Sequence, residues 1–172
     1  FHGNTKGFSW NAWASLKAAA DYANKYDGRV YNSKFNERNV GGYAGYNGTW
    51  GYTHLIVSNF NQRAGIVEGD RDEEGRFIKP LPGGAAGLPL ESDFNSTDPQ
   101  VPFQHIKHFK AVSDNSFHIG GGRLGLNIGY QRNQRMEYGN ADDPAEKELH
   151  FDLQTVSYQL QYHLKETNSW QL

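Results

Sequence analysis

Histidines are the side chains in this chain best able to bind a metal or move a proton near neutral pH, and the sequence holds seven of them. His105 and His108 form the closest pair. In a strand, side chains an odd number of residues apart point to opposite faces of the sheet. We therefore expect this pair not to chelate one ion, and the sequence predicts neither a metal site nor a cofactor.

An acidic segment at 69–75 is the second candidate for chemistry. It ends in Gly75, but Arg, Phe and Ile follow at 76–78, so the twelve-residue ligand pattern of a calcium loop is absent. No nucleophile and base stand at an informative spacing, and no carboxylate pair is suited to acid–base catalysis. We predict that the chain is not an enzyme. A solvated turn is the better interpretation of the four acidic residues, Asp70, Asp72, Glu73 and Glu74.

The composition excludes several other classes. A net charge of −2 without a basic cluster argues against nucleic-acid binding, and the absence of cysteine excludes disulfides and thiolate metal sites. Only 37% of the residues are hydrophobic and 20 are glycine, which leaves few apolar side chains to form the core of a soluble protein. No apolar run approaches the roughly 18 residues of a membrane-spanning helix. A membrane β-barrel accounts for this composition, because only alternate residues of its strands need to be apolar.

Alternation of side chains is the main remaining pattern, and it is clearest at 123–134. One parity is apolar and the other polar, as in a strand whose two faces meet different surroundings. Similar runs at 8–22 and 149–164 exceed the usual soluble strand of about five or six residues and suit a tilted membrane-spanning strand. We assign the apolar parity to lipid: Phe8, Trp10, Leu16, Leu124, Leu126, Ile128, Tyr130, Val156, Tyr158, Leu160 and Tyr162. We assign the polar parity to a barrel lumen: Asn127, Gln131, Asn133, Ser157, Gln159 and Gln161.

Six strands are predicted, at about 7–22, 38–47, 52–62, 103–118, 123–135 and 149–164. A change of parity near Thr155 predicts a β-bulge in the last of them. One alternative remains open for Trp10–Tyr26, because its alanines favour a helix with Trp13, Leu16 and Ala20 on one face.

The connections between these strands alternate in length. Asn47-Gly48 and the glycines at 120–122 predict tight turns, whereas the stretches at 23–37, 63–102 and 137–148 are long. An up-and-down meander therefore has its long loops at one end, as in outer-membrane barrels. Aromatic residues near the turn end would form an interfacial girdle: Phe8, Trp10, Trp50, Tyr52, Phe117, Tyr162 and Trp170.

Two further alternatives concern the class of protein. A soluble antiparallel sandwich also alternates apolar and polar residues, although its strands are usually shorter. A secreted glycan-binding β protein would use exposed aromatic side chains to stack on sugar rings, and it would fold as a monomer without detergent.

Particular phrases of the sequence are also familiar. At Val40–Phe77 the chain reads VGGYAGYNGTWGYTHLIVSNFNQRAGIVEGDRDEEGRF, and His105–Pro144 contains HFKAVSDNSF and GGGRLGLNIGYQRNQRMEYGNADDP. These phrases resemble the early barrel of TonB-dependent outer-membrane receptors, and the resemblance extends over nearly all 172 residues. It contains no cofactor-binding or catalytic motif.

The resemblance implies an all-β segment of about six antiparallel strands from a barrel of about 22 strands that surrounds an N-terminal plug. Such receptors import scarce nutrients across the outer membrane of a Gram-negative bacterium, and a ferric siderophore-type complex is the cargo we expect. The loops at 63–102 and 137–148 would help to grip it. The implied partners are the rest of the barrel, its plug, the TonB complex, outer-membrane lipid and a surface lipoprotein. A passive or structural barrel is the nearest alternative.

We expect the whole chain, 1–172, to be an internal piece of such a barrel. It begins at Phe1 without an initiator methionine or a leader, and it stops after a turn-like stretch at 165–170. Six strands leave two open edges, and unpaired backbone groups in lipid cost several kcal/mol each. The piece would therefore need the rest of its barrel.

Overall fold

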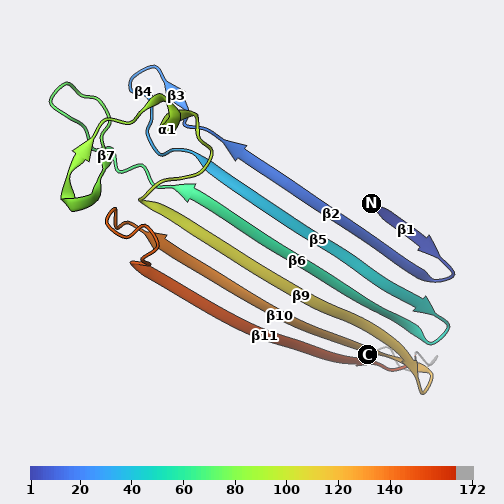
Figure 1. Cartoon of the computed structure of the whole chain (residues 1–172). Helices are drawn as coiled ribbons and strands as arrows, with labels where there is room; N and C mark the ends of the chain where they lie inside the picture. The colour runs from blue at the N-terminus through green and yellow to red at the C-terminus, as the bar shows by residue number, and fades with distance from the viewer. Residues whose placement is uncertain (166–172) are drawn as a thin grey trace.

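One long antiparallel sheet forms most of the chain (Figure 1). The computed structural model describes residues 1–165, and in them the strands follow the order β1-β2-β5-β6-β9-β10-β11. This confirms the predicted all-β, antiparallel fold. The described strands do not close on themselves, because β1 and β11 lie at the two edges. The strand bounds are β1 His2–Thr5, β2 Phe8–Ala19, β5 Phe35–Gly48, β6 Gly51–Gly65, β9 Phe103–Ile119, β10 Gly122–Tyr138 and β11 Leu149–His163.

Two-residue turns join the strands at one end of the sheet. Lys6 and Gly7 connect β1 to β2, and Gly120 and Gly121 connect β9 to β10. All four have positive φ angles, as type I′ hairpin turns require, and glycine adopts them without a steric penalty. These two turns are therefore set by local sequence.

The turn between β5 and β6 differs from the prediction at Asn47-Gly48. Gly48 still pairs with Gly51 in the ladder, so Thr49 and Trp50 make the turn. Packing explains the shift, because the longer hairpin stacks the Trp50 ring between Tyr46 and Phe117, at centroid distances of 6.2 and 5.7 Å. The predicted strand limits, 47 and 52, bracket this turn, but Asn47 and Gly48 stay in the ladder instead of forming it.

Two other expectations are corrected by the strand pairing, and one strand was not expected. Residues 8–19 form β2 and pair with β5, so a helix over Trp10–Tyr26 is wrong. The ladder between β10 and β11 runs without interruption from Arg123↔His163 to Glu137↔Leu149, so the bulge near Thr155 is also wrong. An edge strand, β1, was not predicted, because four residues are too short to establish an alternating pattern.

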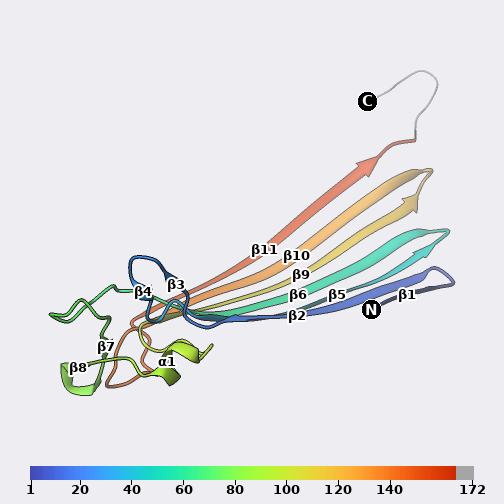
Figure 2. The ribbon, with the colours of Figure 1, turned by 90° about the horizontal axis from the view of Figure 1, so that it is seen from above.

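The long connections gather at the other end of the sheet (Figure 2). Residues 20–34 and 66–102, which we call the loop cap, contain all the small elements of the described residues, and the third loop covers 139–148. The buried apolar cluster of the loop cap consists of Val30, Tyr31 and Phe77, with Phe94 packed against it. The small elements are β3 Ala23–Asn24, β4 Gly28–Arg29, β7 Lys79–Pro80, η1 Pro82–Gly84, β8 Ala86–Gly87 and α1 Glu91–Asn95. Among residues 1–165, no helix has the length and apolar character to cross a membrane.

Candidate functional site

The register of β10 and β11 separates the two sets of side chains selected from the sequence. Residues opposite each other in an antiparallel ladder lie on the same face of the sheet. Leu126 faces Leu160 on one side, which we call face A, and Asn127 faces Gln159 on the other, which we call face B. The remaining apolar pairs of face A are Leu124↔Tyr162, Ile128↔Tyr158 and Tyr130↔Val156.

The other strands extend this apolar surface across the sheet. The ladders place Phe8, Trp10 and Leu16 of β2 on face A, together with Val40 of β5 and Leu55 of β6. Leu16 is 80% exposed and Tyr158 83%. We call this surface the apolar band. Within residues 1–165 no second sheet or helix covers it.

A few polar side chains interrupt the apolar band on β6 and β9, and they bind one another. Thr53 donates to the side-chain oxygen of Asn115. The Asn115 amide donates to Ser113 Oγ at 2.9 Å and to the Leu126 carbonyl at 3.0 Å. Asn115 is consequently buried, and the polar atoms are satisfied inside the sheet, as an apolar surrounding would require.

Face B is more polar but not uniformly so. It carries the six residues proposed for a lumen, of which Ser157, Gln159 and Gln161 lie on β11 and Asn127, Gln131 and Asn133 on β10. Because the ladder has no bulge, face B also carries three apolar residues of β11 near the loop end, Leu149, Phe151 and Leu153. The bulge predicted near Thr155 would have put these three on the apolar side.

Aromatic side chains gather at the turn end of face A. Trp50 stacks with Tyr46 and Phe117, and the Tyr162 hydroxyl donates to the Ile119 carbonyl at 2.9 Å. Phe8 and Trp10 lie at the same end on β2. Of the other two residues in the predicted girdle, Tyr52 lies on face B, where it stacks on His54, and Trp170 lies outside the described residues. The turn-like stretch expected at 165–170 likewise lies almost wholly outside them.

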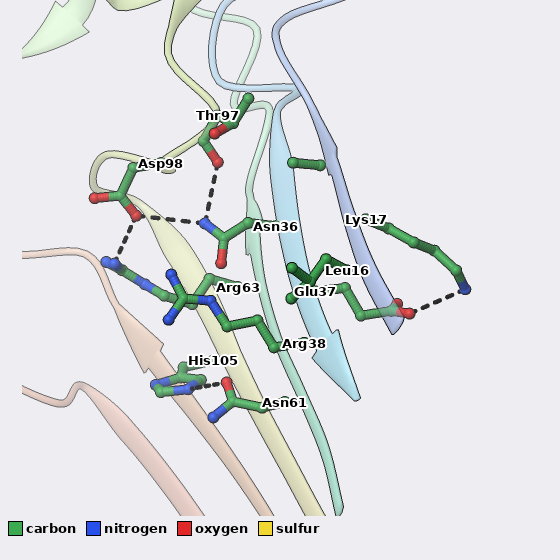
Figure 3. A pocket seen from close by; sticks show the side chains of 11 residues that line it. Leu16, Lys17, Asn36, Glu37, Arg38, Asn61, Arg63, Thr97, Asp98 and His105 are labelled. Carbon is green, nitrogen blue, oxygen red and sulfur yellow. Dashed lines mark hydrogen bonds and ion pairs between the residues drawn. The ribbon is translucent and has the colours of Figure 1, made fainter. Parts of the chain in front are cut away.

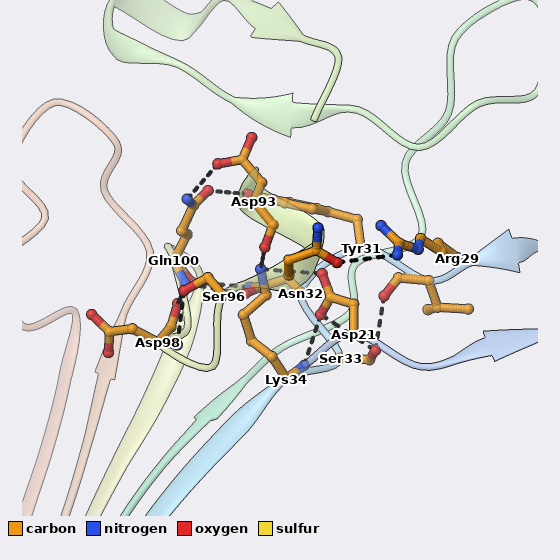
Figure 4. A network of polar contacts seen from close by, with 12 residues as sticks. Asp21, Arg29, Tyr31, Asn32, Ser33, Lys34, Asp93, Ser96, Asp98 and Gln100 are labelled. Atoms are coloured by element: carbon orange, nitrogen blue, oxygen red, sulfur yellow. Dashed lines mark hydrogen bonds and ion pairs between the residues drawn. The ribbon is translucent and has the colours of Figure 1, made fainter. Parts of the chain in front are cut away.

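The loop cap is held by buried polar groups rather than by a large apolar core (Figure 4). Lys34 forms an ion pair with Asp21 at 3.1 Å, and both side chains are fully buried. Lys34 also donates to the Asp93 carbonyl, which joins the two segments of the loop cap. The Asn32 amide donates to the carbonyls of Gln100 at 3.0 Å and of Pro102 at 2.6 Å.

Asp93 is a second centre of this network. It accepts hydrogen bonds from Lys79 at 2.6 Å, from the Leu90 N–H at 2.7 Å and from Gln100 at 2.7 Å. Burial alone would raise the pKa of Asp93, but these donors together hold it at about 2. The neighbouring Tyr31 has its pKa raised, by burial first and then by the charges of Asp93 and Asp21. The network therefore works with Asp93 ionised and Tyr31 protonated.

The candidates for metal chemistry lie apart. His105 shares a face with Met136, and His108 shares the opposite face with Asn133. The acidic segment is a turn in which Asp72 accepts from the Arg76 side chain at 2.7 Å. Within residues 1–165, no group of three or more histidines and carboxylates is arranged to hold a metal ion.

Sequence reasoning missed one feature of face A. Beyond Tyr130 the same parity continues with Arg132 and Gln134, and beyond Val40 it reaches Arg38. The alternation itself carried this signal, because the residues that follow the apolar run must occupy the same face. Face A therefore changes from apolar to basic toward the loop end.

Comparison with known proteins gives no further assignment, since no family model, curated protein or solved structure matches the chain. What the geometry offers is a surface rather than a reaction centre. It consists of a long sheet with an uncovered apolar band, and of loops folded together at one end.

Proposed function

We propose that this chain is a sector of a TonB-dependent outer-membrane receptor that imports a scarce nutrient, with a ferric siderophore-type complex as its cargo. The observation that carries the proposal is the uncovered apolar band on face A. Soluble monomers seldom expose contiguous apolar patches above a few hundred Å², because water drives such surfaces to associate. In a bilayer, acyl chains solvate the band.

The dimensions of the band support a membrane-spanning sheet. On β9 it reaches from Phe117 to Phe109, which at about 3.4 Å per residue is about 27 Å along the strand. A strand tilt of about 40° reduces this to about 20 Å, near the roughly 25 Å apolar band of outer-membrane barrels. Aromatic residues stand at both margins, with Trp50 at the turn end and Phe109 beside Tyr130 at the loop end. Such rings favour membrane–water interfaces.

A membrane-spanning sheet would fix the direction in which its turns, loops and two faces point. The short turns face the periplasm and the loops face outward, as outer-membrane barrels arrange them. Face B then lines the lumen, where Asn127, Gln131 and Gln159 meet plug, water or solute. The unpaired edges of β1 and β11 pair with further strands of the barrel, because open edges are too costly in lipid.

The transport role rests on the resemblance to TonB-dependent receptors at Val40–Phe77 and His105–Pro144. In that role, the loop cap and the loop at 139–148 stand at the outer mouth and take part in gripping the cargo. Energy comes from the inner-membrane TonB complex through the plug. The buried pair of Lys34 and Asp21 keeps the loop cap ordered while it faces water.

Fractionation and uptake measurements on the source bacterium test this function. The native polypeptide should be extracted by detergent from the outer membrane, and its deletion should abolish uptake of one radiolabelled ferric chelate. A protonophore should stop that uptake, because it removes the inner-membrane energy source. Uptake that continues with the protonophore would identify a passive barrel. A soluble polypeptide would overturn the membrane assignment and favour the glycan-binding alternative.

A further inference from the structure

Face A carries a group of cations immediately beyond the apolar band. The ladders align Val40, Asn59, Phe109 and Arg132 in one row across β5, β6, β9 and β10, and that row is the margin of the band. The next rows toward the loops contain Arg38 and Lys107, and then Arg63 and His105. We call the charged members of this group the basic belt: Arg38, Arg63, Lys107 and Arg132.

Only part of this charge is neutralised by the protein. Arg63 binds Asp98 at 2.6 Å, and Arg132 binds Asp152 at 2.9 Å. Among residues 1–165, neither Arg38 nor Lys107 has an acidic partner. They flank Asn61 in one row, about 10 Å apart at the strand spacing of about 4.8 Å. Two uncompensated cations on one face favour an anion between them.

Two hollows show how such an anion would be received. Arg38, Arg63 and His105 line the first around Asn61, and the exposed Leu16 lies beside Arg38 in the same row (Figure 3). The carboxylates of Asp98 and Glu37 also line it, and they are already paired with Arg63 and Lys17. The second, of about 250 Å³, combines the cations Lys107 and Arg132 with the rings of Phe109 and Tyr130. Each hollow therefore joins cationic donors to an apolar surface. That combination fits a molecule with an anionic end and a hydrocarbon end.

We propose that the basic belt binds the phosphate-bearing headgroup of a membrane lipid in the leaflet on the loop side. This inference rests on the proposed membrane-spanning function, which sets the belt at headgroup depth. Guanidinium and ammonium groups are the usual protein donors to phosphate, and Arg38 presents a fork that matches two of its oxygens. The acyl chains lie on the band, against Leu16, Phe109 and Tyr130. Transported cargo would follow face B instead and would not meet the belt.

Native mass spectrometry of the detergent-solubilised native protein tests this proposal, with phosphatidylglycerol and phosphatidylcholine added as probes. The wild-type protein should retain the anionic lipid in preference. Each cation near a membrane surface changes affinity for anionic lipid by about fivefold, so the double variant Arg38→Gln, Lys107→Gln should lose more than tenfold. Lys110→Gln is the matched control, because Lys110 lies on the same strand but on face B. It should retain the wild-type preference.

Each contrary result has a distinct meaning. Equal retention of the two lipids by inserted wild-type protein overturns the lipid site and leaves the proposed function intact, as does an equal loss in the Lys110→Gln control. Complete displacement by inorganic phosphate alone also overturns it and identifies a free-anion site. A native protein that does not enter lipid nanodiscs overturns the proposed function as well.

If the double variant does not insert into the membrane, the salt dependence of lipid binding by the wild-type protein tests the proposal instead. Its preference for phosphatidylglycerol should then weaken from low to high salt, because counterions screen exposed charges. A preference that is independent of salt would overturn the role of the cations.

Discussion

The sheet and the loop cap protect their side chains in opposite ways. In the sheet, β2 and β11 leave large apolar side chains uncovered, such as Leu16 and Tyr158, while the backbone groups between strands are paired. In the loop cap, the side chains of Lys34, Asn32 and Asp21 are fully buried, and all three are polar and hydrogen-bonded. An uncovered apolar face is stable in hydrocarbon, whereas a small polar-cored cap is stable in water. In the proposed membrane assignment, the sheet meets hydrocarbon and the loop cap meets water.

The largest expected effect is local to the loop cap. Lys34→Met leaves the Asp21 carboxylate buried without its cation, which costs about 3–5 kcal/mol. Hydrogen exchange of the native protein should show the amides of 20–34 and 66–102 losing protection while β9 and β10 keep theirs. The control Arg29→Met removes an exposed ion pair with Glu91 and should cost about 0–1 kcal/mol. Equal loss in the strands would show that the two regions are not separate.

A charged residue introduced on face A should lower the free energy of unfolding if that face contacts lipid. Leu160→Arg puts a cation in the apolar band and should cost about 2–4 kcal/mol in lipid vesicles, as for lipid-facing positions of other barrels. Gln159→Arg, the adjacent residue on face B, should cost little. Denaturant unfolding from vesicles measures both. In water, a residue as exposed as Leu160 would tolerate the change within about 0.5 kcal/mol, so equal, small effects would contradict a membrane-facing band.

The junction between the two regions depends on one glycine. A Cβ at Gly65 would lie 2.0 Å from the Asn32 carbonyl oxygen, whereas at Gly125 the nearest atom would be 3.9 Å away. Gly65→Ala should therefore cost about 1–3 kcal/mol through overpacking. Gly125→Ala should be neutral or stabilising, since alanine suits a strand better. Unfolding midpoints of the two variants compare them, and similar midpoints would mean that the loop cap does not sit closely on β6.

The smallest expected effect is the pH dependence of loop-cap stability, which should appear in acid and not near neutral pH. Because the pKa of Asp93 is about 2 in the folded loop cap and higher in an unfolded one, its contribution to stability is complete above about pH 4. It is lost as the pH falls from about 4 through 2. Exchange of the loop-cap amides should accelerate over that range and stay constant from pH 5 to 7. Asp93→Asn should flatten this dependence, and an unchanged profile in the variant would assign the effect to other carboxylates.

Local patterns were sufficient to predict much of the sheet. The alternation at 123–134 identified the two faces of β10, because the side-chain period of a strand is fixed by its backbone. The glycines at 120 and 121 located a turn, because glycine adopts the positive φ angles of this turn without a steric penalty. The parity of His105 and His108 followed directly. The continuation of face A into Arg132 was equally readable and was overlooked.

Pairing between distant residues explains what the sequence did not predict. Leu149, Phe151 and Leu153 suggested a bulge by their own hydrophobicity, but fifteen consecutive ladder partners in β10 fix their facing. The loop cap depends on the hydrogen bond between Asn32 and Gln100, which are 68 residues apart. No local sequence pattern predicts a contact over that distance. The buried pair of Lys34 and Asp21 was hidden for the same reason, since a charged residue in a polar stretch suggests exposure.

The most direct test of the account compares two adjacent residues of β10. The chain contains no cysteine, so Asn127→Cys and Ile128→Cys each give one site for a nitroxide label in it. In vesicles, the label at 128 should collide with oxygen, which concentrates in hydrocarbon, and the label at 127 with a water-soluble nickel complex. Opposite accessibilities at these neighbours would establish a sheet with lipid on face A and water on face B. Equal access of the nickel complex to both labels would contradict it.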